Sequence, residues 1–507
     1  MKAVAHRWVL TALFATYVLT RYPDVGGRIN MGDSAKFQFL ARVLGIGHAS
    51  GNPVYLMASA LWVRLPIPLS DATKVTLLSG VAGIGAIALV SQAVHLLDLP
   101  ALSLPRLTLE VRSLAAILLG LGSLFWTLST EAEVYTLGAL FVGGVVLGLA
   151  RWCIRSDARG LYLAIGSLGL GLGNHLTIVA LAPAVLYAIF GDAAGRALLR
   201  TPRFWLVVGG ALALAVLPYG WIAWRLSHAP LAYSELPAPF EWSAFYRFVT
   251  ARGVADATHT HFNYRVAIER LPDLFAQLQK QWLWPLLLFA PFGAVRLHQL
   301  QRRFAVALAL GVLGYFGIAL WFQIPDPEGL FVPVSVLLAI PLALAPNGTT
   351  PLATMLGLHA MLAVLHVGLW SHDEYSAYVQ QTPEGKVVVN LPTLHEVAPE
   401  HAMIGVPCGH YGCVEITAYY ALVDTELRER DVSFVRFAWS EWDDGKLAVP
   451  LVDPKAPQTR PICVILNNDL TKLRELGLDP KPIARAPVKV HSRTFTSPPL
   501  YCVAPHP

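Results

Sequence analysis

The sequence predicts an all-α polytopic membrane protein followed by a separate C-terminal α/β domain. Of its 507 residues, 55% are hydrophobic and 14% are charged, and the mean hydropathy is +0.52. An average soluble domain carries roughly 25% charged residues. The chain has about eleven apolar runs that suit a bilayer crossing, and charge becomes frequent after residue 370. Because the net charge of +5 is small and not clustered, no nucleic-acid partner is expected.

The predicted spans are separated by short polar or glycine-containing segments. They cover residues 8–21, 76–97, 112–128, 135–151, 160–172, 175–190, 203–225, 281–295, 303–322, 330–345 and 352–370. Lys2 and Arg7 precede the first run as in a secretory signal, but no small-residue cleavage site follows it. The first run therefore reads as a retained signal anchor.

The distribution of lysine and arginine predicts the orientation in the membrane. One face collects basic residues in successive loops, and basic loops stay in the cytoplasm. These residues are Lys2, Arg7, Arg106, Arg112, Arg151, Arg155, Arg159, Arg196, Arg200, Arg203, Arg296, Arg302 and Arg303. The opposite short loops, 129–134, 173–174 and 323–329, contain none. We therefore expect a multi-pass protein of the inner (cytoplasmic) membrane, with a cytoplasmic N-terminus and with segments 22–74, 226–280 and 371–507 outside.

Two domains are predicted, a membrane domain over 1–370 and an extracytoplasmic α/β domain over 371–507. In the second, strand-like runs at 386–390, 432–438 and 463–467 alternate with helical patterns at 415–430 and 470–476. It carries four of the five cysteines, Cys408, Cys413, Cys463 and Cys502. An outside location permits disulfides in any of three connectivities. A zinc site of Cys408, His410 and Cys413 lacks a second ligand pair with zinc-like spacing.

The first outer segment contains two helical patterns, 34–44 and 54–65, that are too short to cross a bilayer. They are interrupted by Gly, Pro or Asn, and we expect them to lie along the membrane surface. This arrangement would hold Asp33 at the mouth of the helix bundle.

Acidic residues gather on the predicted outer face. They are Asp33, Glu131, Glu133, Asp326 and Glu328, and His175 joins them at a turn. Carboxylates at a membrane boundary without basic neighbours in sequence are costly, which indicates a functional site. Each residue also has a structural alternative. Asp33 and Ser34 could cap a helix, the glutamates could be solvated, and His175 could be a hydrogen-bonded helix end.

Several motifs resemble bacterial protein O-mannosyltransferase-like membrane proteins of the GT-C glycosyltransferase superfamily. "GDSAKF" (32–37) is similar to that family's Asp-Ser-Gly-Glu-Phe signature, and "GIGHASGNPVYLM" (45–57) to its Gly-x-x-His-Pro-Pro-Gly-Tyr-Pro-Leu-Tyr segment. "EVYTL" (133–137), "GNHL" (173–176) and "DPE" (326–328) resemble three further motifs. The likeness spans about residues 8–345, and Lys36 stands where the family usually has Glu.

The resemblance implies a GT-C fold and a sugar, commonly mannose, carried on polyprenyl phosphate. It implies inverting transfer to an acceptor hydroxyl on a protein or an envelope glycan at the outer surface. A phosphate leaves without protonation, so one carboxylate acting as general base can suffice. We expect Asp33 to be that base, with Glu133 as the second catalytic residue. The expected substrate-binding residues are His48, Tyr55, Asn174, His175, Arg252, Asp326 and Glu328.

The leaving phosphate requires positive charge or N–H donors. Among Lys36, His48, His175, Arg247 and Arg252, the favoured candidates are His175 and Arg252. We expect no cofactor, although Glu133 could help Asp33 to ligate a divalent metal. Two other classes remain open. One is a transporter or flippase of a lipid-linked sugar, which usually has mid-membrane charges and repeats, and the other is a non-catalytic envelope scaffold.

Overall fold

The structure of the protein is a computed structural model. The described residues are 2–3, 5–21, 33–104, 107–228, 231–236, 239–252, 264–321, 328–346, 348–373, 379–382, 385–388, 400–407, 422–423, 428–437, 462–465, 481–484, 487–490, 493–496 and 500–503. The chain forms two compact units. The larger comprises Met1–Arg21, Leu44–Pro68 and Lys74–Gly368, and the smaller comprises Tyr22–Val43, Leu69–Thr73 and Leu369–Pro507. The predicted domain boundary after residue 370 stays a prediction.

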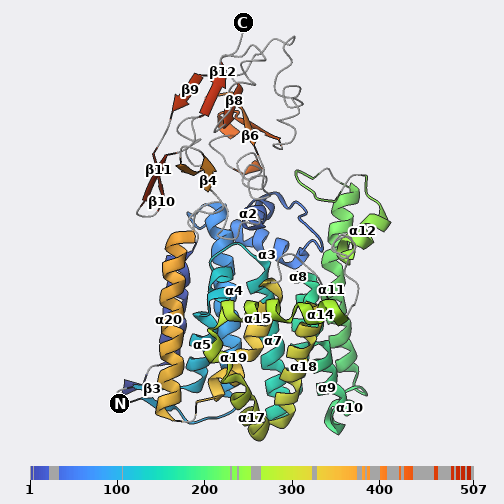
Figure 1. Cartoon of the computed structure of the whole chain (residues 1–507). Coiled ribbons are helices and arrows are strands. Elements are labelled where there is room, and N and C mark those ends of the chain that lie inside the picture. Colours follow the sequence, from blue (N-terminus) through green and yellow to red (C-terminus); the bar gives the residue numbers. More distant parts are fainter. Residues whose placement is uncertain are drawn as a thin grey trace. The chain divides into compact units, whose positions relative to one another are not determined.

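The larger unit is a bundle of helices (Figure 1). Its first half contains α1 (His6–Thr20), α3 (Pro53–Val63), α4 (Asp71–His95), α5 (Val111–Gly120), α6 (Ser123–Ser129), α7 (Val134–Arg155), α8 (Ala158–Asn174), the 3-10 helix η1 (Leu176–Leu181), α9 (Ala182–Phe190) and α10 (Ala193–Leu198). Its second half contains α11 (Pro202–His228), α12 (Trp242–Val249), α14 (Tyr264–Glu269), α15 (Leu271–Gln281), α16 (Trp284–Leu287), α17 (Ala290–Leu300), α18 (Arg302–Trp321), α19 (Glu328–Leu344) and α20 (Thr349–Asp373).

Each predicted span coincides with one helix or with two or three consecutive helices. Within the described residues, five helices are long and apolar enough to cross a membrane, namely α4, α7, α11, α18 and the Thr349–Val367 part of α20. The chain is therefore a multi-pass membrane protein with mostly helical structure. The total of about eleven crossings stays a prediction, because several of the remaining helices are shorter than a usual span.

Two predicted spans are not single straight helices. The run 112–128 is divided into α5 and α6, which meet at an angle of 71°. The run 281–295 begins with the last residue of α15 and continues as α16 and α17. A crossing at each of these two runs stays a prediction, and the bend within the first was not predicted.

The first outer segment of the larger unit is fixed at both ends. The Lys74 ammonium donates to the carbonyls of Val63 and Leu65 at 3.0 Å each, and the Trp62 indole donates to the Lys74 carbonyl at 2.7 Å. A cation suits the negative end of the α3 dipole. At the other end, Ile46 is fully buried in an apolar cluster with residues of α11 and α12. The segment around His48 is thus packed in the fold.

The smaller unit contains α2 (Asp33–Val43) and the C-terminal strands. Helix α2 is buried from Ser34 to Ala41, and its Arg42 forms a bidentate ion pair with Asp71 at 2.5 and 2.7 Å. Both predicted short helices are present, as α2 and α3, whereas their position on a membrane surface stays a prediction. A five-stranded mixed sheet has the order β7-β6-β8-β12-β9.

The strands of this sheet are β6 (Met403–Pro407), β7 (Ser433–Phe437), β8 (Ile462–Ile465), β9 (Lys481–Ala484) and β12 (Leu500–Val503). Two-stranded sheets pair β4 (Val379–Thr382) with β5 (Gly385–Val388) and β10 (Pro487–Val490) with β11 (Arg493–Thr496). The predicted strand runs overlap β5, β7 and β8, whereas the predicted helix 470–476 and most of 415–430 lie outside the described residues. A small sheet of β1 (Lys2–Ala3), β3 (Leu107–Leu109) and β2 (Leu102–Leu104) belongs to the larger unit.

Candidate functional site

The acidic turn between α6 and α7 is buried inside the larger unit. Glu131 has no exposed surface and Glu133 retains 4%. The Glu133 backbone N–H donates to the Ser79 hydroxyl at 3.2 Å, and that hydroxyl lies 3.3 Å from the Glu133 carbonyl. Ser79 of α4 therefore fixes the backbone of this turn. The expectation that the two glutamates could be solvated loop residues was wrong.

Tyr55 of α3 lies close to the same turn. Its side chain is fully buried, which raises its pKa above the ordinary value. The nearby Glu133 carboxylate raises the pKa of Tyr55 further, and the Ser79 hydroxyl lowers it. A charged group acts in this way only at short range. Tyr55, Ser79 and Glu133 therefore form one buried cluster, in which the tyrosine stays neutral.

Asn174, the last residue of α8, connects the motif at 173–176 to this cluster. Its amide nitrogen Nδ2 donates to the Val134 carbonyl at 3.1 Å, directly after Glu133. The side chain is fully buried, and its oxygen Oδ1 has no hydrogen-bond partner among the described residues. Asn174 thus holds the start of α7 against the end of α8.

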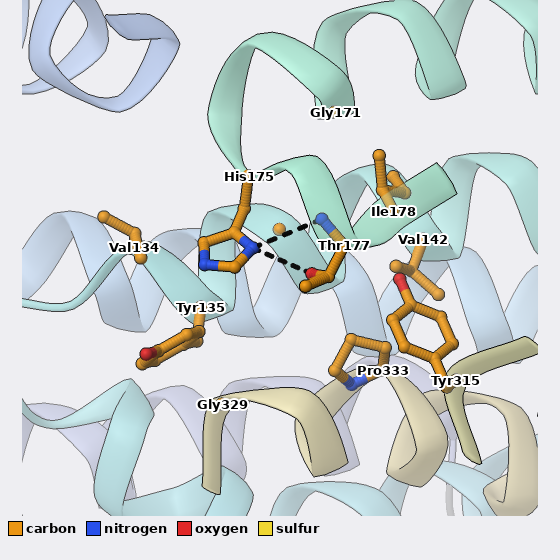
Figure 2. Close-up of a pocket in the computed structure, with 11 residues that line it drawn as sticks. Val134, Tyr135, Val142, Gly171, His175, Thr177, Ile178, Tyr315, Gly329 and Pro333 are labelled. Atoms are coloured by element: carbon orange, nitrogen blue, oxygen red, sulfur yellow. Dashed lines mark hydrogen bonds between the residues drawn. The ribbon is translucent and has the colours of Figure 1, made fainter. Parts of the chain in front are cut away.

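His175 faces a small pocket beside this junction (Figure 2). Its Nδ1 accepts from the Thr177 backbone N–H at 3.4 Å and lies 2.8 Å from the Thr177 hydroxyl. The ring centroid of His175 lies 5.8 Å from that of Tyr135. His48 is an electrostatic neighbour of His175. Asn174 and His175 therefore lie beside the start of α7, directly after the buried acidic turn.

The pocket joins α7, α8, η1, α18 and α19. Its lining residues are Val134, Tyr135, Gly138, Val142, Gly171, His175, Thr177, Ile178, Tyr315, Gly329 and Pro333. Its volume of about 20 Å³ holds roughly one water molecule. Gly329 lies so close to Tyr135 that a Cβ atom there would overlap the ring. The pocket is too small for a sugar in this conformation.

Asp33 begins α2 in the smaller unit. Its carboxylate pairs with the Lys36 ammonium at 3.1 Å, one turn along the helix. Lys36 is buried, while Asp33 is 30% exposed. The interpretation of Asp33 as an acid without a basic neighbour was therefore wrong. Because Asp33 belongs to one unit and Glu133 and His175 to the other, a shared pocket for the three stays a prediction.

The remaining predicted residues lie apart or outside the described chain. Glu328, at the start of α19, pairs with Lys280 of α15, so this acid is not without a basic partner either. Arg252 is exposed shortly after α12. Asp326 lies outside the described residues. Among the described residues, no group of three or more His, Cys, Asp or Glu side chains could hold a metal ion.

Four residues of the cluster were not predicted, namely Ser79, Tyr135, Thr177 and Gly329. Tyr135 and Thr177 lie within two residues of Glu133 and His175 and could have been found from the motifs. Gly329 directly follows Glu328 and could have been found in the same way. Ser79 could not, since a single serine in an apolar helix gives no signal.

Comparison with known proteins agrees with these motifs. Residues 33–196 match the family model of the protein O-mannosyl-transferase TMEM260 N-terminal domain. The protein O-mannosyl-transferase TMEM260 of Mus musculus is 31% identical over 177 residues, which cover 34% of this chain and 23% of that protein. The match thus spans about a quarter of the curated relative.

Two solved structures share the fold over nearly the whole chain. ArnT from Cupriavidus metallidurans in the apo state aligns with a TM-score of 0.57 and 12% identity, covering 98% of this chain and 97% of that one. The same protein bound to undecaprenyl phosphate gives a TM-score of 0.58 and 12% identity, with 99% and 98% coverage. The chain is therefore related in sequence, over residues 33–196, to the protein O-mannosyl-transferase TMEM260, and it has the fold of ArnT.

Proposed function

We propose that this chain is a GT-C glycosyltransferase that moves a sugar, mannose in the first instance, from a polyprenyl-phosphate donor to an acceptor hydroxyl. The observation that carries the proposal is the family match over residues 33–196, which begins at Asp33 and includes Glu133, Asn174 and His175. The fold shared with an undecaprenyl-phosphate-bound protein supports a lipid-phosphate donor. The acceptor would be a protein or an envelope glycan at the extracytoplasmic face.

In the proposed reaction, the acceptor oxygen forms a bond to the anomeric carbon while the bond from that carbon to the phosphate oxygen breaks. The acceptor proton passes to the Asp33 carboxylate, and the polyprenyl phosphate leaves with the electron pair. Asp33 suits this role because it is partly exposed, and Lys36 at 3.1 Å orients its carboxylate. A general base contributes about 10²–10⁴-fold to the rate.

Glu133 and its neighbours would position the substrates in this scheme. Glu133, Tyr55 and Asn174 are almost fully buried, so in this conformation they would act by holding neighbouring residues in place and not by contacting a substrate. His175 and His48 are the nearby groups that could donate to the phosphate oxygens. Arg252 is exposed and lies in the predicted outer segment 226–280, from which it could contact the phosphate of the lipid donor.

The deciding experiment measures sugar transfer by the purified full chain. It is incubated with radiolabelled polyprenyl-phosphate sugars, and hydrolysis or transfer is counted. We expect Asp33→Asn to reduce product formation by about 10²-fold or more. Asp157→Asn is the matched control, because it removes a carboxylate that caps the N-terminus of α8, at the end of that helix away from Asn174 and His175. Full activity of Asp33→Asn in well-folded protein would contradict the assignment of the base.

One observation favours the alternative of a lipid-linked sugar transporter. Transporters place substrates at broken helices, and α5 and α6 form such a pair, bent by 71°. Yet the backbone carbonyls at this bend are occupied by side chains and are not left to coordinate a substrate. Movement of a lipid-linked sugar in proteoliposomes without any glycosyl product would establish the transporter instead.

A further inference from the structure

The bend between α5 and α6 releases backbone groups that a straight helix would pair internally. In the hydrocarbon region each unpaired group costs several kcal/mol, so bent spans need other partners. Here the carbonyls of four consecutive residues, Ile117 to Gly120, all accept a side-chain donor. Those of Ile117 and Leu119 also keep a backbone donor, the N–H groups of Leu121 and Gly122. The bend is therefore a built feature of the bundle.

The donors come from three other helices. The His359 ring nitrogen Nε2 of α20 donates to Ile117 O at 3.0 Å, and the Trp282 indole donates to Leu118 O at 2.7 Å. The Tyr17 hydroxyl of α1 donates to Gly120 O at 2.7 Å. All three side chains are almost completely buried. These three hydrogen bonds, however, all end on carbonyls of α5, and none of them reaches α6.

Gln281 is different because its one amide bonds both sides of the bend. Its Nε2 donates to Leu119 O in the last turn of α5 at 3.1 Å. Its Oε1 accepts from the Phe125 N–H in the first turn of α6 at 2.9 Å. An amide carries its donor and its acceptor on two separate atoms and has no charge, so one side chain can bond both helices at once. Gly122 allows the approach, since a Cβ atom there would overlap the Gln281 amide.

Helix α6 leads directly into the acidic turn. Its seven residues end at Ser129, and Glu131 and Glu133 follow before α7 begins. The direction of a short helix depends on how its first turn is held. Besides Gln281, two side-chain hydrogen bonds hold α6, from Ser123 to His366 and from Trp126 to Thr20, at 2.7 Å each. We propose that Gln281 is a positioning residue that fixes α6 and thereby the Glu131–Glu133 turn of the active site. The catalytic part of this inference rests on the proposed function.

The experiment compares Gln281→Leu with Trp282→Phe. Both variants remove buried hydrogen bonds at the same bend, but Trp282 bonds only the α5 side. Hydrogen–deuterium exchange is measured on peptides covering 123–133 and 111–118. We expect Gln281→Leu to increase exchange over 123–133 by roughly 10-fold or more, while Trp282→Phe leaves that segment unchanged. Unchanged exchange in Gln281→Leu, or an equal increase in both variants, would overturn the inference.

Gln281→Glu provides a conservative variant because burial favours its protonated carboxyl, whose oxygen accepts from the Phe125 N–H and whose O–H donates to Leu119 O. Its exchange over 123–133 should be close to that of the wild type. This variant keeps the test decisive if Gln281→Leu does not fold. Loss of protection as large as in the leucine variant would count against the inference. In the transfer assay, Gln281→Leu should lower kcat by about 10-fold with less than about 3-fold change in the donor KM, as expected for lost positioning. A wild-type chain without transfer activity would overturn the proposed function, whereas the exchange result decides the role of Gln281 by itself.

Discussion

Asn174 shows how one side chain can connect two distant motifs. Its amide nitrogen is bonded to the Val134 carbonyl 40 positions earlier in the chain, next to Glu133. The adjacent His175 lines the pocket that also contains Tyr135. A buried amide can therefore set the position of the acid and the imidazole together without contacting a substrate.

We predict that Asn174→Asp reduces both stability and sugar transfer. The ionised carboxylate keeps the size of the side chain but has no donor for Val134 O, and an unsatisfied buried group costs about 1–3 kcal/mol. The melting temperature in detergent should fall, and activity should drop by roughly 10-fold. Tyr219→Phe is the control, because it removes the bond to Leu172 O at the same end of α8. Equal behaviour of the two variants would show that Asn174 has only a structural role.

The ion pairs show which residue contacts can be read from the sequence. Asp33 and Lys36 are separated by one helical turn, a spacing that brings side chains together. The pairing was therefore accessible from the motif itself. Lys280 and Glu328 are 48 residues apart, and no local pattern could have joined them. The clustering of Glu133, Asn174 and His175 was predictable in outline because each ends or begins a helix on the same predicted face.

At the scale of elements, apolar periodicity located the helices but missed the bend. The run 112–128 contains Gly120, Gly122 and Ser123, and such residues permit a kink. They do not require one, since α4 contains Gly80, Gly83 and Gly85 and is a single helix. The polar partners of the bend, Tyr17, Gln281 and His359, lie in three other predicted spans. Each looks like an isolated polar residue in the sequence. Their role can be recognised only in the fold, which brings them to neighbouring carbonyls at the end of α5.

The sheet of the smaller unit makes a prediction about its cysteines. Cys463 in β8 and Cys502 in β12 are direct partners in the antiparallel register. Opposite residues in such a pair have Cα atoms about 4.5–5.5 Å apart, which is within the range of a disulfide. Among the three connectivities, the register favours Cys463 with Cys502, leaving Cys408 for Cys413.

Peptide mapping by mass spectrometry under non-reducing conditions tests this pairing. We expect a linked peptide that contains Cys463 and Cys502 and disappears on reduction. Oxidation of the two thiols requires thiol–disulfide exchange with an oxidised partner, which the extracytoplasmic side provides. Protein purified from a membrane fraction after rapid alkylation should show these cysteines unmodified. A Cys408–Cys463 or Cys408–Cys502 linkage would contradict the register.

At the scale of the whole molecule, arginines hold helix ends on the predicted cytoplasmic face. Arg296 donates to the carbonyls of Leu344 and Pro346 at 3.0 Å each, just beyond α19. Arg303 pairs with Asp192, which caps α10. Arg296 thus satisfies backbone carbonyls and Arg303 pairs with a carboxylate, and both belong to the set of basic residues from which the orientation is predicted. The same residues therefore hold the fold and carry the predicted orientation.

The number of crossings decides the sides on which the two ends lie. An odd number, such as the about eleven that the apolar runs predict, puts the termini on opposite sides of the membrane. We predict that in intact spheroplasts an added protease removes a C-terminal epitope tag and leaves an N-terminal tag on the same full chain. Both tags should be removed after detergent treatment, which controls for protease access. Equal protection of the two tags would mean an even number of crossings, and the two bent or interrupted runs, 112–128 and 281–295, would be the first to reconsider. Removal of the N-terminal tag alone would keep the odd count but reverse the orientation, and the Glu133 and His175 cluster would then face the cytoplasm.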